Sequence, residues 1–292
     1  MEENVNKTSF SWQIFSSFWL KIFAMIAMTL DHIGVLLIPI DSPWNLVFRI
    51  IGRLAIPLYA FMIAEGIKHT KNVWLYLLKN GIMATFISIA LLIAVECNIL
   101  PEMRTAGNIF LDLTLGILGG YLLIHKNKGL RWLALLPLLF AVGSTIVVVY
   151  ENETGALVHW FPYWLRTQYD FFAIALIYSF VLAGKLKDLF FRWYCQKNNL
   201  PEDTFDQSQY NQLAMNIIAI LFLVIIQIIY YVVSMFYQTS ALEMQSYSIL
   251  AGVFILLYNG KRGYNKKWFQ YSAYLYYPVH IGIIALIYLL IG

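Results

Sequence analysis

Long apolar runs separated by short polar segments dominate the pattern of this chain. About nine of these runs approach the roughly 20 residues that a helix needs to cross a bilayer. Their apolar residues are continuous rather than alternating, which favours helices over membrane strands. The pattern therefore predicts an all-α fold, a polytopic integral membrane helix bundle that forms one domain over residues 1–292. The expected spans are 18–40, 46–67, 73–95, 108–125, 130–150, 169–186, 211–236, 246–259 and 270–291.

The composition supports a membrane protein. Hydrophobic residues make up 60% of the chain and charged residues 12%, whereas soluble domains carry about 25% charged residues. The polar N-terminal segment lacks the small-residue cleavage site of a signal peptide. The first apolar run is therefore expected to remain as the first span.

Basic residues gather on one set of alternate loops and at the adjoining span ends. This set holds 16 of the 20 Lys and Arg residues, whereas Arg104 and Arg166 lie on the other set. The positive-inside rule then predicts a cytoplasmic N-terminus and an outside C-terminus. Topology and lipid headgroups account for the basic excess, so no nucleic-acid partner is expected. Cys97 and Cys195 fall on opposite sides in this topology and cannot bridge each other.

The first span contains two adjacent ionisable residues, Asp31 and His32. Ionisable groups inside a span are costly, and they usually face a protein interior where they have a function. The second span contains Arg49 and Arg53, which lie four residues apart and therefore share a helix face. Arg49 is close enough to the interface to snorkel outward. Pro57 cannot donate to the carbonyl of Arg53, so a kink is expected there.

Helix geometry separates the roles of the adjacent pair. Neighbouring helical residues diverge by about 100°, so Asp31 and His32 do not naturally bond each other. The first two spans run in opposite directions, and Asp31 and Arg53 therefore reach a similar depth in the outer half. A buried guanidinium needs an anionic or carbonyl partner, which predicts an Asp31–Arg53 pair that fixes the two helices. His32 is then the candidate general base.

Other polar groups at depth are few, and we expect Arg49 and three of these groups to bind substrate. Asn108 and Asp112 are spaced i, i+4 at the outer start of the fourth span. His280 lies in the last span, within the sequence YSAYLYYPVH. A lone intramembrane histidine can also be a hydrogen-bonded packing residue, and the sequence leaves both interpretations open.

The sequence EGIKHTK at the inner end of the second span combines Glu65, Lys68, His69 and Lys71. These residues are interpreted either as an ordinary positive rim or as a docking site for an anionic cofactor. The chain has no HExxH, clustered cysteines, Walker A or GxSxG motif. No metal is therefore expected.

Several segments resemble the TraX family of membrane proteins, which is named for the acetylase of conjugative F-type pilin. They are KIFAMIAMTLDHIG, GRLAIPLYAFMIAEGIKHTKN and YLLKNGIMATFIS, with weaker echoes at NIFLDLTLGILGG and YLYYPVH. The resemblance implies a multi-spanning acyltransferase of the bacterial inner membrane that takes acetyl-CoA from the cytoplasm. It implies His32 as the catalytic base and Asp31 as its structural neighbour. It also places Arg53, Glu65 and His69 in family motifs.

Together, the residues and the resemblance predict transfer of an acetyl group from acetyl-CoA to an amine or hydroxyl. The acceptor would be a membrane-associated or exported peptide, glycan or lipid. Arg53 or Asn108 would stabilise the developing oxyanion, and the cationic EGIKHTK segment would hold the CoA phosphates. The alternative is a transporter or flippase whose proton or substrate pathway is formed by Asp31, His32, Arg53 and His280.

Overall fold

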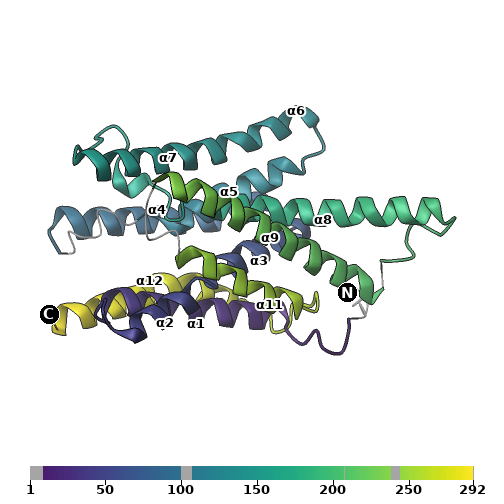
Figure 1. Ribbon diagram of the computed structural model, residues 1–292, viewed down its shortest axis with the longest axis horizontal. Coiled ribbons are helices and arrows are strands. Elements are labelled where there is room, and N and C mark those ends of the chain that lie inside the picture. Colours follow the sequence, from purple (N-terminus) through teal and green to yellow (C-terminus); the bar gives the residue numbers. More distant parts are fainter. Residues whose placement is uncertain (1–8, 100–106, 207, 238–243, 292) are drawn as a thin grey trace. The chain divides into compact units, whose positions relative to one another are not determined.

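The computed structural model describes residues 9–99, 107–206, 208–237 and 244–291, and these residues form an all-α protein (Figure 1). In this part of the chain the extended pairing is limited to one isolated bridge, between Phe15 and Tyr258. The predicted fold class is therefore confirmed. The helices are α1 Ser17–Leu36, α2 Pro43–Gly52, α3 Ala55–His69, α4 Val73–Glu96, α5 Ile109–Leu123, α6 Lys128–Arg131, α7 Leu135–Thr154, α8 Phe172–Lys197, α9 Gln209–Tyr237, α11 Ala251–Leu256 and α12 Lys267–Ile291, with 3-10 segments η2 Trp132–Ala134, η3 Tyr163–Leu165 and η4 Ser246–Leu250.

Helices long and apolar enough to cross a bilayer mark this as a membrane protein. Six described segments meet that standard: Ser17–Leu36, Pro43–His69, Val73–Glu96, Lys128–Thr154, Gln209–Val233 and Lys267–Ile291. Two shorter apolar helices, Ile109–Leu123 and Ser246–Leu256, coincide with two further predicted spans. The remaining predicted span begins α8, which carries Lys185, Lys187 and Asp188 within one crossing length. The count of nine spans and the cytoplasmic N-terminus stay predictions.

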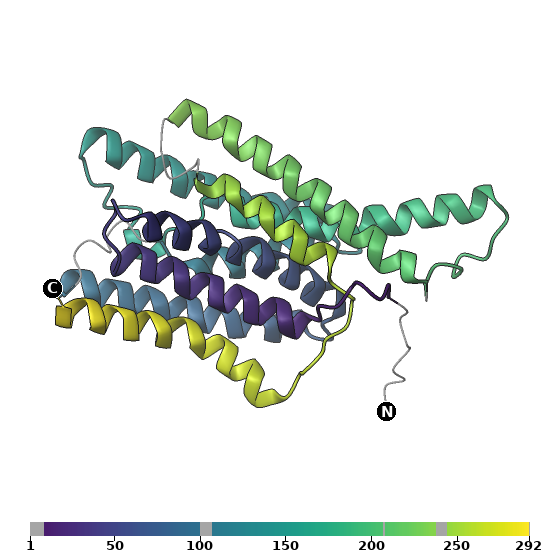
Figure 2. The ribbon, with the colours of Figure 1, turned by 60° about the horizontal axis from the view of Figure 1, so that its bottom comes forward.

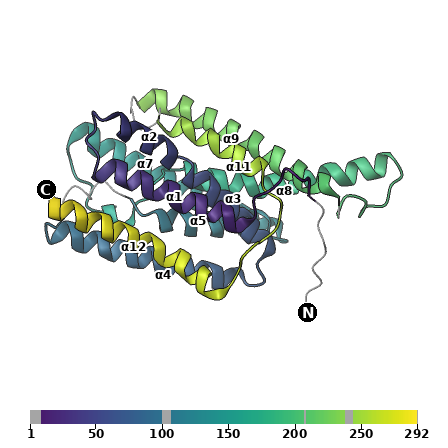
Figure 3. The same ribbon diagram turned by 90° about the horizontal axis from the view of Figure 1, so that it is seen from below.

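The chain divides into two compact units, which we describe separately. The first contains residues 1–62 and 182–292, and the second contains residues 63–181. In the first unit, α1 packs against both α2 and α12, as Figure 3 shows for α12. Figure 2 shows α2, in dark blue, running beside the purple α1. The first helix therefore packs against one helix that is next to it in sequence and one from the far end of the chain.

A glycine allows α1 and α2 to approach closely. A Cβ atom on Gly52 would lie 2.3 Å from the Cβ of Asp31, which is closer than real Cβ atoms come. Small residues serve this purpose at many membrane helix interfaces, because they let backbones approach. The close approach brings the arginines of α2 within reach of the Asp31 carboxylate.

The predicted kink in the second span is confirmed as a break between α2 and α3. Helix α2 ends at Gly52, and α3 begins at Ala55, two residues before Pro57. Pro57 has no N–H to donate to the carbonyl of Arg53, so regular α-helical bonding cannot continue through this point. Arg53 consequently sits at a helix end, with its backbone N–H still donating to Arg49 at 3.2 Å.

In the second unit, α5 is the central helix and packs against α4 and α7 (Figure 1). Glycines also line its contact with the start of α8. A Cβ on Gly116 would collide with Ile177, and one on Gly119 would lie 1.6 Å from the hydroxyl of Tyr178. A larger residue at either position would require the facing side chain to move.

Candidate functional site

One buried carboxylate in the first unit binds two arginines. Arg53 donates from Nη2 to both oxygens of Asp31 at 2.7 Å, and Arg49 donates from Nη1 to Oδ1 at 2.9 Å. The side chains of Asp31 and Arg53 are each 9% exposed, whereas that of Arg49 is 25% exposed. The Asp31–Arg53 pair predicted from the sequence is therefore present, and Arg49 joins it. The carboxylate ties α1 to α2.

Arg53 makes further hydrogen bonds. It donates from Nε to the carbonyl of Arg49 at 3.3 Å and from Nη1 to Oε1 of Gln245 at 3.2 Å. Gln245 is 3% exposed, and its Nε2 has no hydrogen-bond partner among the described residues. A buried donor without an acceptor is costly, so this amide nitrogen is suited to bind an oxygen of a guest molecule.

His32 turns away from the arginines and meets α12. Its Nδ1 lies 2.9 Å from Nε2 of His280, and Nδ1 of His280 lies 2.7 Å from the carbonyl oxygen of Tyr276. His280 is 6% exposed, whereas His32 is only partly buried. The two imidazoles thus form a chain that ends on a backbone carbonyl, with His32 as its accessible member.

A second polar contact joins the same two helices. The hydroxyl of Thr29 donates to the carbonyl of Met25 at 3.0 Å, so its single proton is committed there. The 2.6 Å contact between this hydroxyl and that of Tyr276 must then be donated by the tyrosine. Because Thr29 lies one turn before His32, the two contacts fix α12 along α1.

Helix α1 therefore presents two polar faces. Asp31 faces α2, while Thr29 and His32 face α12. The separation of Asp31 from His32 that helix geometry predicts is observed. His280 contacts His32 on α1 and is therefore not an isolated histidine. The substrate-binding role expected of His280 stays a prediction.

Asn108 is fully buried in the second unit and uses its whole amide internally. Its Oδ1 accepts from the backbone N–H groups of Phe110 and Leu111, which makes it the N-cap of α5. Its Nδ2 donates to the carbonyl of Ala84 at 2.6 Å and to the hydroxyl of Ser88 at 2.9 Å. These four bonds match the four that an amide can make, and they join α5 to α4.

Asp112 is also fully buried and binds the segment before α8. Its carboxylate accepts from the backbone N–H groups of Gln168 at 2.7 Å and Tyr169 at 3.2 Å. These bonds hold the loop that follows η3. The substrate-binding role expected of Asn108 and Asp112 stays a prediction.

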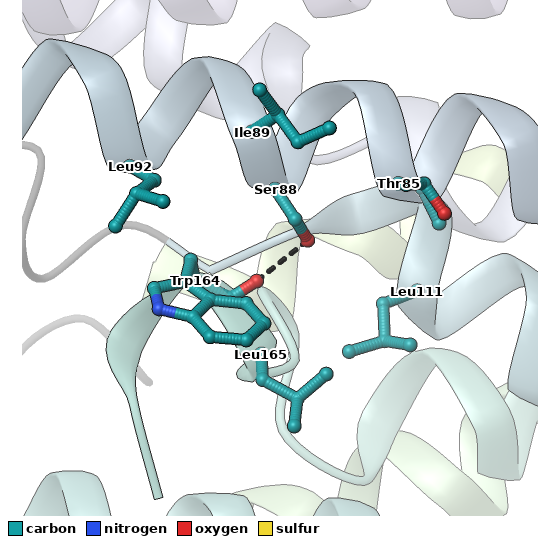
Figure 4. A pocket seen from close by; sticks show the side chains of 8 residues that line it. Thr85, Ser88, Ile89, Leu92, Leu111, Trp164 and Leu165 are labelled. Atoms are coloured by element: carbon teal, nitrogen blue, oxygen red, sulfur yellow. Dashed lines mark hydrogen bonds between the residues drawn. The ribbon is translucent and has the colours of Figure 1, made fainter. Parts of the chain in front are cut away.

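A pocket of about 300 Å³ lies beside this network, between α4, α5 and η3 (Figure 4). Its lining is apolar except for Thr85 and Ser88. The Ser88 hydroxyl donates to the carbonyl of Trp164 at 2.6 Å. Because its lining has no titratable side chain, the pocket suits a hydrocarbon group and supplies no base.

The EGIKHTK segment lies at the end of α3 and in the turn that follows. Nε2 of His69 lies 3.7 Å from a carboxylate oxygen of Glu65, and the His69 side chain is 42% exposed. Lys68 and Lys71 are exposed as well, and Asn72 caps α4 through Leu75. The segment therefore presents cationic groups to the surroundings, as the sequence predicts.

Comparison with known proteins identifies the family. A family model described as TraX protein matches residues 16–192. The chain belongs to the TraX family. It is also 27% identical, over 92% of its own length and 94% of its relative's, to a protein of Dichelobacter nodosus named "Probable fimbrial assembly protein FimC, serogroup H1". No solved structure matches the chain.

The TraX match includes Asp31, His32, Arg53 and the EGIKHTK segment, but it ends before η4 and α12. Two residues that complete the site, Gln245 and His280, therefore lie beyond it. The sequence analysis placed neither Thr29 nor Tyr276 in the site, and it interpreted Tyr276 as a packing residue, although each lies about one turn before a histidine of the site. That spacing was a usable signal for the shared face, whereas nothing in the sequence pointed to Gln245.

Proposed function

We propose that this TraX-family protein is a membrane-embedded acyltransferase. It would move an acetyl group from acetyl-CoA to an amine or hydroxyl of a membrane-associated or exported acceptor. The observation that carries the proposal is the imidazole of His32, which is partly accessible, is oriented by a second helix and lies next in sequence to Asp31, the acid that binds Arg49 and Arg53. Such a group is suited to accept a proton from a nucleophile.

The reaction would proceed by addition and elimination at the thioester carbonyl. The acceptor nitrogen or oxygen attacks the carbonyl carbon while His32 takes the acceptor's proton. Collapse of the tetrahedral intermediate breaks the carbon–sulfur bond, and the proton passes to the departing thiolate. The products are the acetylated acceptor and free CoA, so atoms and charge balance.

We assign the remaining roles to two groups of the arginine cluster. Asp31 holds Arg49 and Arg53, so we assign it a structural role in fixing α1 against α2. The buried Nε2 of Gln245, whose Oε1 is held by Arg53, is an available donor to the carbonyl oxygen of the acyl group. An oxyanion needs donors that are positioned before the reaction begins.

Acetyl-CoA would bind through its phosphates. The exposed Lys68, His69 and Lys71 form the cationic segment proposed to hold them, and Glu65 orients His69. This arrangement suits an anionic ligand of the cytoplasm, in the inner-membrane topology that the basic residues predict. The chemistry needs no metal.

The acceptor would be an exported component of a surface fibre. Support comes from the relative of Dichelobacter nodosus, whose name describes a probable fimbrial assembly protein and whose likeness covers nearly the whole chain. Membrane lipids surround the apolar helices and remain a second class of acceptor to test.

The decisive experiment measures acetyl transfer by the purified protein in nanodiscs, with labelled acetyl-CoA and envelope fractions as acceptor. His32→Ala should abolish transfer, whereas His159→Ala, at an exposed loop position, should leave it unchanged. Mass spectrometry of envelopes with and without the gene should reveal an acceptor that lacks one acetyl group. Wild-type transfer by His32→Ala would refute the assignment of the base.

A transporter remains the second candidate because one observation favours it. The chain from His32 through His280 to a backbone carbonyl joins two helices, as proton relays do. Proton flux into liposomes separates the two functions. A transporter would move protons without acetyl-CoA and would not consume it.

A further inference from the structure

We infer that His280 is a positioning residue that holds His32 in one tautomer, with the proton on Nδ1 and the lone pair on Nε2. This inference rests on the proposed function, because it names the group that orients the proposed base. It goes further by assigning which nitrogen takes the acceptor's proton and by giving α12, which lies beyond the TraX match, a part in the chemistry.

The assignment starts from the carbonyl oxygen of Tyr276. A carbonyl oxygen only accepts, so the Nδ1 of His280 that lies 2.7 Å away must carry a proton. A neutral imidazole has one N–H, and Nε2 of His280 is therefore an acceptor. The nitrogen of His32 that lies 2.9 Å from it, Nδ1, must then donate. The remaining nitrogen of His32, Nε2, carries a lone pair.

The charges around the pair favour two neutral rings. On α1, Asp31 supplies one negative charge, and on α2 Arg49 and Arg53 supply two positive charges that already bind it. The groups of α12 beside the rings, the phenols of Tyr276 and Tyr277, are uncharged side chains. A resting imidazolium would add a second unbalanced positive charge inside the protein, which is expensive.

The rings are held in place by more than their mutual bond. The Tyr276 ring stacks on His280 with centroids 4.9 Å apart and planes 17° apart. The Tyr276 hydroxyl donates to Thr29, one turn before His32 on α1. Tyr276 therefore fixes His280 through its ring and its carbonyl, and it fixes the position of α12 through its hydroxyl.

This chain of groups does for His32 what an orienting partner does for any catalytic base. It fixes the ring's direction, selects the tautomer and stabilises the imidazolium that forms when the base accepts a proton. During transfer, the acceptor's proton would arrive on Nε2 of His32 while Nδ1–H keeps its bond to His280. The same proton then leaves with the CoA thiolate.

Histidine 15N resonances report the tautomer directly and do not depend on activity. The full-length protein in nanodiscs would carry Gln in place of His69, His125 and His159, so that only the pair gives signals. We expect both His32 and His280 in the Nδ1–H form. An Nε2–H form of His32 in this protein would overturn the inference.

Two substitutions separate positioning from packing. His280→Gln places an amide oxygen near the lost Nε2 and should keep the His32 tautomer. His280→Phe keeps a ring but has no acceptor, and the His32 signals should shift to a mixture of tautomers. Thr29→Val removes only the neighbouring contact, so it should lower thermal stability and leave the tautomer unchanged. An unchanged tautomer in His280→Phe would overturn the inference.

Kinetics provide the second measurement. A base in the wrong tautomer loses rate rather than binding, so His280→Phe should lower kcat by about 10²-fold or more at constant KM for acetyl-CoA. His280→Gln should restore kcat to within about tenfold of wild type. If the wild-type protein transfers acetyl and His280→Phe has the same kcat, the positioning role is wrong and the proposed function stands. If wild type transfers no acetyl to any acceptor, the proposed function fails while the resonances still decide the tautomer.

Discussion

Replacing Asp31 with alanine should destabilise the protein more than any other single change in the charge cluster. The substitution leaves Arg53, whose side chain is 9% exposed, without its carboxylate and beside the guanidinium of Arg49. Removing one partner of a buried ion pair typically costs about 3–5 kcal/mol. Two unit charges roughly 4 Å apart interact by about 4 kcal/mol at an effective dielectric constant near 20, which agrees with that range.

The exposed arm of the cluster should behave differently. Arg49 has a side chain that is 25% exposed, and Asp31 keeps its two bonds to Arg53 when Arg49 is removed. Arg49→Ala should therefore cost about 1 kcal/mol or less. The stability lost in Arg53→Ala should lie between the losses in Asp31→Ala and Arg49→Ala, because Arg49 remains to neutralise the carboxylate.

The assay is equilibrium unfolding in mixed micelles, followed by the fluorescence of the nine tryptophans. Glu202→Ala, an exposed acid in a polar loop, is the matched control and should shift the free energy of unfolding by less than about 0.5 kcal/mol. The double variant Asp31→Ala/Arg53→Ala should be more stable than Asp31→Ala alone, because it removes the orphaned charge.

Two results would refute this reasoning. If Asp31→Ala cost no more than Arg49→Ala, the carboxylate would not be the centre of the cluster. The second result is additivity. If the loss of unfolding free energy in the double variant equalled the sum of the losses in the two single variants, Asp31 and Arg53 would not be coupled, and the buried ion pair would contribute nothing of its own.

The remaining predictions concern packing and cofactor binding. Gly52→Ala should lower the free energy of unfolding by about 1–3 kcal/mol, because its Cβ would collide with Asp31 on the neighbouring helix. Gly143→Ala, where a Cβ meets nothing within 4 Å, is the control, and equal stability of the two variants would contradict the packing argument. The double change Lys68→Gln/Lys71→Gln should raise KM for acetyl-CoA about tenfold at constant kcat. The exposed Lys126→Gln should leave KM unchanged, and an unaltered KM in the double variant would place CoA elsewhere.

The contact between Asp31 and Arg53 was predictable from the sequence. An acid in an apolar helix must find an opposite charge at its own depth, and the next span offers one only 22 residues away. The helix break was predictable too, since proline cannot continue the ladder of backbone bonds. Both predictions need only local geometry and the antiparallel direction of neighbouring spans.

The pairing of His32 with His280 was beyond the sequence because 248 residues separate them. Which distant helix packs against α1 depends on the whole arrangement of the unit, and hydropathy carries no information about it. Asn108 illustrates a related difficulty. Its position before an apolar run fits an N-cap, but its bonds to α4 depend on the tertiary fold.

The number of membrane spans could not be predicted from hydropathy alone, for a different reason. Helix α5 has 15 residues and is interrupted by nothing, yet it is shorter than a typical crossing. A hydropathy pattern identifies apolar helices well, and all nine predicted runs coincide with helical segments. It does not measure whether a short helix passes through the whole bilayer.

The two polar faces of α1 meet their partners at different times while the chain is being synthesised. The carboxylate of Asp31 can meet its arginines as soon as α2 follows α1 into the membrane. Thr29 and His32 must wait for α12, which begins about 230 residues after α1 ends. At roughly 5–20 residues per second, that delay is about 12–46 s. During biogenesis the ion cluster can therefore stabilise the hairpin of α1 and α2 early, whereas the contact between His32 and His280 forms only after α12 has been synthesised.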